Sequence, residues 1–481
     1  MVDVLLTHSN HLYNDRKQVR KMQPYPPLQT LLAAACLRRE GYRVALFDPA
    51  LAEPEAGFTQ ALARHRPRLV AVCEDNFNFL TKMCLLRNRE LAGWMARTAR
   101  RAGVPAIVNG SDASDRAAEY LGAGFSYVLE GEVEASIVEI ARLLLGGAGF
   151  SLPTPSGLPG PALRGIAFRD PQSGEVRHTV RRAPIADLDS LPMPAWDLID
   201  AGPYREAWLA AHGYFSMNMV SSRGCPYRCN WCAKPIWGDS YHCRSARLVA
   251  EEMLEIKTRF QPGHLWFADD IFALSQHWTL EFATAVESLG AQIPFKMQSR
   301  CDLMTRPTVG GLRRAGCVEV WMGVESGAQD VLDAMDKGTR LGQVHEARAN
   351  LRRHGIRACY FLQFGYPGET WAEIEKTIAL VRQTRPDDIG ISVSYPLPGT
   401  AFHQMVSSQL GPKENWADSD DLDMMFQGAF TTGFYRALAD ALHVEVREGR
   451  PAAEEAWSTV LALKDTCARK LPVKLPVWTS C

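Results

Sequence analysis

The sequence predicts an α/β protein with a doubly wound, Rossmann-like N-terminal domain, a partial (β/α)6 barrel and a helical C-terminal tail. Short apolar runs alternate with helical patterns over residues 1–145, and a Gly- and Pro-rich stretch interrupts them at 146–164. A second alternation of strands and helices then runs from 217 to 395. Alternation of this kind is typical of parallel sheets covered by helices. We therefore expect four regions, at 1–145, 146–210 (linker and connector), 211–405 and 406–481.

The first domain has the strand spacing of a doubly wound sheet. Strands are expected at 2–7, 43–47, 69–73, 106–108 and 127–129, and helices at 28–39, 59–65, 85–102 and 113–121. Ligands of such sheets lie outside the carboxyl ends of the strands. We therefore expect one crevice surrounded by the loops at 7–10, 74–78, 109–112 and 130–132.

The second alternation contains six strand–helix units, which suits an open barrel better than a closed eight-stranded one. Strands are expected at 217–221, 264–268, 294–298, 318–323, 358–364 and 389–395. Helices are expected at 245–259, 276–288, 307–314, 327–335, 342–354 and 370–384. The active site should lie at the carboxyl ends of these strands. Before the barrel, 165–168 should pair with 176–180 as a hairpin, and after it a mostly helical tail should begin at 411.

Composition narrows the class of protein. The 481 residues are 46% hydrophobic and 22% charged, as in globular domains, and the net charge of −1 without a dense basic run disfavours tight nucleic-acid binding. No apolar run is long enough to span a membrane, and the N-terminus leads directly into a strand-like segment rather than a signal peptide. Scattered single cysteines are typical of a reducing compartment, so a cytoplasmic location without membrane contact is expected.

Three cysteines, Cys225, Cys229 and Cys232, have the spacing C-x3-C-x2-C. Three thiolates on one short loop can hold three irons of a cubane cluster and leave the fourth iron open, which indicates that a small molecule binds there. The alternatives are three structural thiols or a zinc knuckle completed by Cys243 or His242. The apolar run before the loop, the glycine turn at its start and the tryptophan before the third cysteine favour the cluster.

At this motif the chain resembles the radical S-adenosylmethionine (SAM) enzymes, whose signature is C-x3-C-x-aromatic-C. The resemblance implies a [4Fe–4S] cluster whose open iron binds the amino and carboxylate groups of SAM. Electron transfer from the cluster then cleaves SAM to a 5′-deoxyadenosyl radical. The aromatic residue of the motif, Trp231, is expected near the adenine.

Five further segments at the expected strand ends match this family in order. The resemblance implies that Asp269 or Asp270 holds the SAM amino group, although a helix N-cap is an alternative for one of them. Arg300 is expected to pair with the SAM carboxylate or with an acidic group of the substrate, and Glu325 to contact the ribose. The turn at Gly365 and the P-x-P-G-T segment around Pro398 complete the expected SAM site.

The first domain resembles the cobalamin-binding domain found upstream of many radical SAM barrels. The matching segments are 24–28, 46–48, 108–111 and 127–132, and the resemblance implies contacts from Tyr25, Pro26, Gly110, Ser111, Gly131 and Glu132. The motif D-x-H-x-x-G is absent, so cobalamin is expected to bind without histidine on cobalt. Some relatives keep this domain without binding the corrin, and that alternative stays open.

Together these features resemble the B12-dependent radical SAM family. The resemblance implies a methyltransferase that uses a [4Fe–4S] cluster, SAM and cobalamin to methylate an unactivated carbon or phosphorus centre of a small molecule or natural-product intermediate, with a reducing donor such as flavodoxin or ferredoxin. One alternative is the same architecture performing cyclisation, ring contraction or oxidation. Another is a corrinoid or redox sensor. Tyr366 and Tyr395 are weak candidates for hydrogen transfer, and the motifs leave the substrate unspecified.

Overall fold

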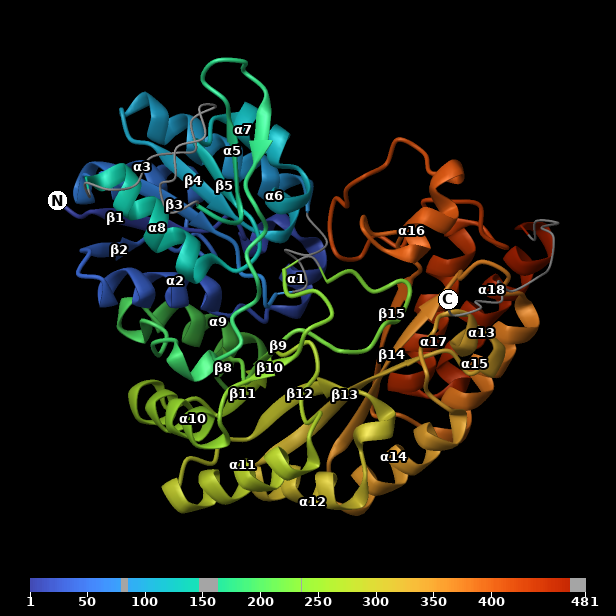
Figure 1. The fold of residues 1–481 in the computed structure, drawn as a ribbon. Helices are drawn as coiled ribbons and strands as arrows, with labels where there is room; N and C mark the ends of the chain where they lie inside the picture. Colours follow the sequence, from blue (N-terminus) through green and yellow to red (C-terminus); the bar gives the residue numbers. More distant parts are fainter. Residues whose placement is uncertain (79–84, 147–162, 235, 468–481) are drawn as a thin grey trace.

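The computed structural model describes residues 1–78, 85–146, 163–234 and 236–467. Figure 1 shows the blue-to-teal N-terminal domain above the barrel and the orange-to-red C-terminal region beside it. Within the described residues, no helix combines the length and the apolar character needed to cross a bilayer.

The N-terminal domain is the predicted doubly wound domain. Its sheet has the order β2-β1-β3-β4-β5-β6-β7. The strands are β1 (Val4–Thr7), β2 (Val44–Leu46), β3 (Leu69–Cys73), β4 (Ala106–Asn109), β5 (Tyr127–Leu129), β6 (Ile166–Arg169) and β7 (Val176–His178). β1 to β5 are parallel, and the predicted hairpin, β6 and β7, extends the sheet antiparallel rather than remaining in a linker.

Helices cover both faces of this sheet, so its strands are buried on both sides. They are α2 (Leu28–Arg39), α3 (Pro54–His65), α5 (Leu86–Arg101), α6 (Ser111–Asp115), α7 (Ala117–Ala123) and α8 (Val133–Leu145). Alternate residues of one strand enter two separate cores: Leu5 joins the core under α3 and α5, and Leu6 joins the core under α2 and α8. This explains why the strand sequences are continuously apolar.

The barrel sheet confirms the predicted six units, with the order β15-β14-β13-β12-β11-β8 and parallel pairing throughout. Its strands are β8 (Ser216–Met219), β11 (His264–Phe267), β12 (Phe295–Ser299), β13 (Cys317–Glu325), β14 (Arg357–Phe364) and β15 (Asp388–Val393). β8 and β15 are free edges of the sheet, so the barrel is open. A short ladder joins β9 (Ser222–Arg223) to β10 (His242–Cys243).

Six helices follow the barrel strands, and those visible along the lower edge of Figure 1 lie outside the sheet. They are α10 (Ala246–Phe260), α11 (Gln276–Leu289), α12 (Arg306–Ala315), α13 (Gln329–Ala334), α14 (Leu341–Arg353) and α15 (Trp371–Thr384). Ser245, Ser275 and Thr305 begin the first three helices, because each side chain accepts a hydrogen bond from a backbone N–H of the first turn.

The remaining elements connect or flank the two sheets. The helices are α1 (Arg16–Lys21), α9 (Gly202–His212), α16 (Ala401–Val406), α17 (Thr432–Glu448) and α18 (Glu454–Cys467). The 3-10 turns are η1 (Leu12–Asn14), η2 (Leu188–Ser190), η3 (Trp196–Leu198), η4 (Cys301–Leu303), η5 (Ser407–Gln409) and η6 (Arg450–Ala453).

The predicted, mostly helical C-terminal tail is present as α17 and α18, but its first segment, 411–431, forms no helix. This segment is rich in turn-forming Gly, Pro, Asp and Ser, and it crosses to the N-terminal domain. Arg116 Nη1 pairs with Glu414 Oε2 at 2.7 Å, and Ser419 N donates to Asp15 Oδ2 at 3.2 Å. Contacts with a distant domain therefore replace the local helix.

Candidate active site

The cysteine loop follows β9 and begins with a turn that only glycine can adopt. Gly224 has φ 77°, and a Cβ there would collide with the carbonyl oxygen of Ser240. Cys225, Cys229 and Cys232 form no disulfide, and each is partly exposed. The loop closes through a 3.1 Å hydrogen bond from Cys232 N to Cys229 O.

Asn230 anchors the loop from inside the motif. Its backbone N donates to Met335 O at 3.1 Å, and its Nδ2 donates to Ala334 O at 2.7 Å. The single hydrogen of the Tyr366 hydroxyl is shared between Asn230 Oδ1 at 3.1 Å and Ala334 O at 2.9 Å. Tyr366, predicted as a weak candidate for hydrogen transfer, therefore lies fully buried behind the loop and holds it in place. Sequence reasoning missed Asn230, although its position between two ligand residues was visible.

The arrangement of the cysteines bears on the zinc alternative. In the part of the chain that the structure describes, no three His, Cys, Asp or Glu side chains converge as one metal ion requires. A cubane needs no such convergence, because each cysteine binds a different iron. Cys243 and His242, the two alternatives for a fourth zinc ligand, lie on β10 in the ladder opposite Ser222 and Arg223.

The two predicted aspartates have different surroundings. Asp269 is fully buried and accepts hydrogen bonds from Ser221 N (3.1 Å), Ser221 Oγ (2.6 Å) and Ser222 Oγ (2.5 Å). Burial raises the pKa of Asp269 to about 6. Asp269 therefore fixes the backbone that leads into the cysteine loop.

Asp270 lies close enough to Cys225 to affect its ionisation. Burial raises the pKa of Cys225, and the Asp270 carboxylate adds to that rise. Neither aspartate caps a helix, since Ser275 begins α11.

Arg300 braces the cysteine loop. Its Nε donates to Asp302 Oδ1 at 2.9 Å, and its Nη1 donates to Lys337 O at 2.8 Å. The guanidinium carbon lies 3.7 Å from the ring centroid of Tyr227, which belongs to the loop. This cation–π contact and the two hydrogen bonds hold the guanidinium in one orientation beside the loop.

Glu325 lies at an irregularity of β13, where the pairing with β14 shifts between Gly323 and Glu325. Glu325 has φ 62°, a left-handed backbone that is uncommon for a residue with a side chain and is often found at functional sites. Its Oε1 accepts from Lys337 Nζ at 2.7 Å, and both side chains are buried. Burial lowers the pKa of Lys337, but Glu325 and Cys229 outweigh burial and raise it.

Lys337 was missed from sequence because no motif marks it. Its Nζ lies 5.9 Å from the ring centroid of Trp231, the aromatic residue of the cysteine motif. The indole Nε1 of Trp231 is buried and has no hydrogen-bond partner among the described residues. Glu325, Lys337 and Trp231 thus form one cluster against the cysteine loop.

The turn at Gly365 is held by Glu369. Gly365 has φ 77°, and its N–H donates to Glu369 Oε2 at 2.6 Å. Burial raises the pKa of Glu369 to about 8.

The predicted segment after β15 contains Pro398 and Tyr395. Pro398 is exposed in the loop between β15 and α16. The Tyr395 hydroxyl donates to Asp421 O, so this second weak candidate joins the barrel to the 411–431 segment.

Tyr25 and Pro26 lie between the N-terminal domain and the barrel. The Tyr25 ring centroid is 4.9 Å from that of Trp266 on β11, and its hydroxyl is 3.3 Å from Ser216 Oγ on β8. Pro26 O accepts from Asn218 Nδ2 at 3.0 Å. The segment that resembles cobalamin-binding domains is therefore packed against two barrel strands.

A small crevice lies at the carboxyl ends of β1, β3 and β4. Its cavity of about 20 Å³, room for about one water, is lined by Ser9, Glu74, Leu85, Asn88, Arg89, Gly110, Ser111, Asp112, Ala113 and Tyr120. Ser111 Oγ and Asn88 Nδ2 are buried there and lack a hydrogen-bond partner among the described residues. A Cβ on Gly110 would lie 3.0 Å from the Glu74 side chain, so the glycine lets Glu74 approach. Gly131 has φ 74°, and its carbonyl accepts from Asn109 Nδ2 at 2.9 Å.

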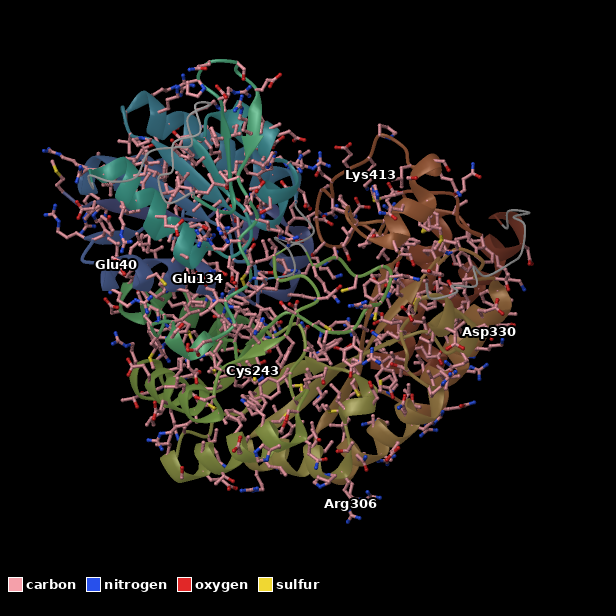
Figure 2. The ribbon with its side chains drawn as sticks, in the orientation of Figure 1. Glu40, Glu134, Cys243, Arg306, Asp330 and Lys413 are labelled. Atoms are coloured by element: carbon pink, nitrogen blue, oxygen red, sulfur yellow. The ribbon has the colours of Figure 1, made fainter. Side chains whose placement is uncertain are left out.

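The carboxyl ends of the two sheets meet at Arg223, two residues before Cys225. Its guanidinium pairs with Glu132 Oε1 at 2.8 Å and Glu134 Oε1 at 2.5 Å, and all three side chains are buried. Figure 2 shows Glu134 on the side of the N-terminal domain that faces the barrel. Phe77, after β3, stacks on Trp237 of the barrel at 5.1 Å. Arg223 and Glu134 were missed from sequence because an interdomain ion pair leaves no local pattern.

Comparison with known proteins shows which proteins this chain resembles. Residues 219–381 match the family model of the radical SAM superfamily, so the chain carries the predicted radical SAM domain, which implies a [4Fe–4S] cluster and SAM. An uncharacterized methyltransferase of Pyrococcus horikoshii is 25% identical over 261 residues, 54% of this chain and 55% of the relative. The anaerobic magnesium-protoporphyrin IX monomethyl ester cyclase of Rubrivivax gelatinosus is 26% identical over 259 residues, 52% and 44% of the two chains. The chain thus spans about half the length of these relatives.

One solved structure shares most of the fold. The radical SAM methyltransferase TsrM from Kitasatospora setae, with cobalamin and a [4Fe–4S] cluster bound, superposes with a TM-score of 0.67 and 17% identity. The superposition covers 85% of this chain and 76% of that chain. This likeness confirms the predicted combination of a doubly wound domain and a partial barrel.

Proposed function

We propose, from the radical SAM domain at 219–381, that this protein is a cobalamin-dependent radical SAM methyltransferase. It would methylate an unactivated carbon or phosphorus centre of a small-molecule or natural-product intermediate. The observation that carries the proposal is the contact of Arg223 with Glu132 and Glu134. This contact sets the ligand-binding edge of the first sheet against the cysteine loop, so cofactors held at the two edges would face one substrate.

Cys225, Cys229 and Cys232 would hold the cluster, and Asn230 and Tyr366 would keep their loop in place. When bound and reduced, the cluster supplies the electron that cleaves the SAM sulfonium. The protein supplies the buried Glu325–Lys337 pair, which is desolvated and held in one orientation.

We assign the SAM amino group to Asp270 rather than Asp269, because the Asp269 oxygens already accept hydrogen bonds from Ser221 and Ser222. A carboxylate forms a strong charge-assisted hydrogen bond with an ammonium group. Glu325 would contact the ribose hydroxyls beside Trp231, as the resemblance implies. Arg300 would reach a carboxylate only from the orientation that Asp302 and Tyr227 give it.

Cobalamin would be held at the first sheet, where it would carry a methyl group from a second SAM, which leaves S-adenosylhomocysteine, to the substrate. The fit rests on the unpartnered Ser111 hydroxyl and Asn88 amide at the carboxyl edge of that sheet. A ligand larger than water enters this crevice only if the lining side chains move. His8 lies nearby, but its Nε2 pairs with Asp48 Oδ1 at 3.0 Å, so it is already engaged. This supports binding without histidine on cobalt.

The test uses the full chain, reconstituted anaerobically with iron, sulfide and hydroxocobalamin. With dithionite and SAM it should release 5′-deoxyadenosine, and S-adenosylhomocysteine should form only when cobalamin is bound. The ultraviolet–visible spectrum after desalting reports bound cobalamin. Failure to form S-adenosylhomocysteine in the cobalamin-loaded protein would contradict methyl transfer.

The second candidate function is radical chemistry without methylation, such as cyclisation, ring contraction or oxidation. The similarity to the Rubrivivax gelatinosus cyclase favours it. Release of 5′-deoxyadenosine without S-adenosylhomocysteine would select this function. Release of neither product would instead leave the sensor hypothesis.

A further inference from the structure

The inner face of the barrel sheet carries an exposed aromatic side chain. On β14, Tyr360 and Leu362 are buried in the core beneath the outer helices, so Phe361 between them points to the inner face. β14 has a strand on each side, yet Phe361 is 37% exposed. A large apolar side chain in the middle of a sheet is normally covered, so this exposure requires an explanation.

Phe361 stacks on Trp321 of the neighbouring β13, so each ring covers one face of the other. Their ring centroids are 5.0 Å apart at an interplanar angle of 30°, and Trp321 Nε1 donates to Glu319 Oε1 at 2.7 Å. Both rings extend over Gly390 on β15, where a Cβ would lie 3.2 Å from Phe361 Cδ1 and 3.3 Å from Trp321 Cζ3. Glycine at 390 thus makes room for the rings. We call Trp321, Phe361 and Gly390 the ring platform.

The ring platform adjoins the candidate SAM site. Gly323 is the register partner of Phe361, and a Cβ at 323 would lie 2.6 Å from Lys337 Nζ and 2.7 Å from Glu325 Oε1. The Glu325–Lys337 pair therefore lies over β13, the strand that also carries Trp321 of the platform. A molecule bound on the rings would therefore lie close to a SAM molecule in contact with that ion pair.

We propose that the ring platform binds a flat, conjugated ring of the substrate; this rests on the proposed radical SAM function. Aromatic side chains gain most from offset stacking on another planar ring, and a puckered saturated ring of the same size loses that contact. Ligand sites combine such apolar surfaces with a few fixed polar groups, which the Glu325–Lys337 pair supplies. The platform thus selects the ring, and the adjacent SAM site acts on it or on a substituent.

The test compares two probes with the same carbon skeleton, naphthalene-2-carboxylate and its saturated analogue decalin-2-carboxylate. Binding to the anaerobic holoprotein with SAM is measured by calorimetry and by tryptophan fluorescence. We expect the flat probe to bind about tenfold more tightly. Equal affinities, or no binding of the flat probe at millimolar concentration, would overturn the proposal.

Variants test whether the flat probe binds at the ring platform. Phe361→Leu keeps an apolar side chain and should remove most of the preference, and Gly390→Ala should reduce it by tilting the rings. Tyr13→Leu, at a ring that is 53% exposed outside the barrel, should leave the preference unchanged. Thermal unfolding verifies that each variant is folded, and a preference retained in Phe361→Leu would contradict the proposal. Because probe binding needs no turnover, a preference without deoxyadenosine release would reject the proposed function alone.

Discussion

The two parallel sheets of this protein differ in how many faces are buried. Strands β1, β3 and β4 are buried at every residue, because helices cover both faces of the first sheet. Strands β12 and β15 alternate between buried and partly exposed residues, because helices cover only the outer face of the barrel sheet. A ligand can therefore reach the first sheet only at its edge. The barrel offers an edge and an inner face, which is room for both a cofactor and a substrate.

The largest expected effect is a loss of function at the barrel sheet that leaves ligand binding at the first sheet intact. Cys229→Ala should reduce iron and sulfide content and bring 5′-deoxyadenosine below detection, because the cluster loses one of three ligands. Hydroxocobalamin binding by the first domain should remain, as measured spectroscopically after desalting. Cys243→Ala, at an exposed cysteine on β10, is the control and should retain cleavage. Cleavage by Cys229→Ala would rule out the cluster.

The second largest expected effect is a loss of stability when the ion pairs of Arg223 between the two sheets are removed. Arg223→Met leaves the Glu132 and Glu134 carboxylates buried without a cation, which should lower the free energy of unfolding by about 3–5 kcal/mol. Urea titration measures this change. Adding Glu132→Gln and Glu134→Gln should restore part of the loss, because the uncompensated charges are removed. Arg314→Met, which breaks the exposed pair with Glu287, should change little.

The free energy of unfolding should depend on pH through Glu369, which lies in the turn after β14. Glu369 has a pKa raised from 4.5 to about 8 by burial, so between these values the folded state keeps a proton that the unfolded state has lost. The contribution of Glu369 to stability is therefore constant below 4.5 and falls as the pH rises towards 8, by at most about 1.4 kcal/mol per pH unit. Glu369→Gln should flatten this part of the urea-derived stability profile. Glu375→Gln, exposed on α15, should leave the slope unchanged.

The smallest expected effect concerns the loop anchor. Tyr366→Phe removes the hydroxyl that donates to Asn230 Oδ1 and Ala334 O, and should cost about 1 kcal/mol of unfolding free energy. Loss of the cluster absorbance in chelator should become faster, because the loop opens more often. Tyr13→Phe is the matched exposed control. An unchanged rate of cluster loss in Tyr366→Phe would show that Asn230 holds the loop without this hydroxyl.

The order and boundaries of most elements could be read from the sequence. The predicted strands at 69–73 and 127–129 agree with β3 and β5, because a short apolar run bounded by turn residues defines a buried strand locally. The cysteine motif was equally readable, since its spacing lies within one loop. The 411–431 segment was not, because its contacts with Arg116 and Asp15 lie far away in the chain.

Local patterns were thus sufficient for the two sheets and the cluster loop, because these depend on residues close together in the chain. Only the tertiary structure shows which partners three buried residues have. Asp269 bonds to the backbone before the cysteine loop, Lys337 pairs with Glu325, and Arg223 pairs with two carboxylates of the other domain. Each of these partnerships joins different structural elements, and the burial that makes it strong exists only after those elements have packed. For the same reason the ring platform, formed across three strands, becomes visible only in the folded barrel.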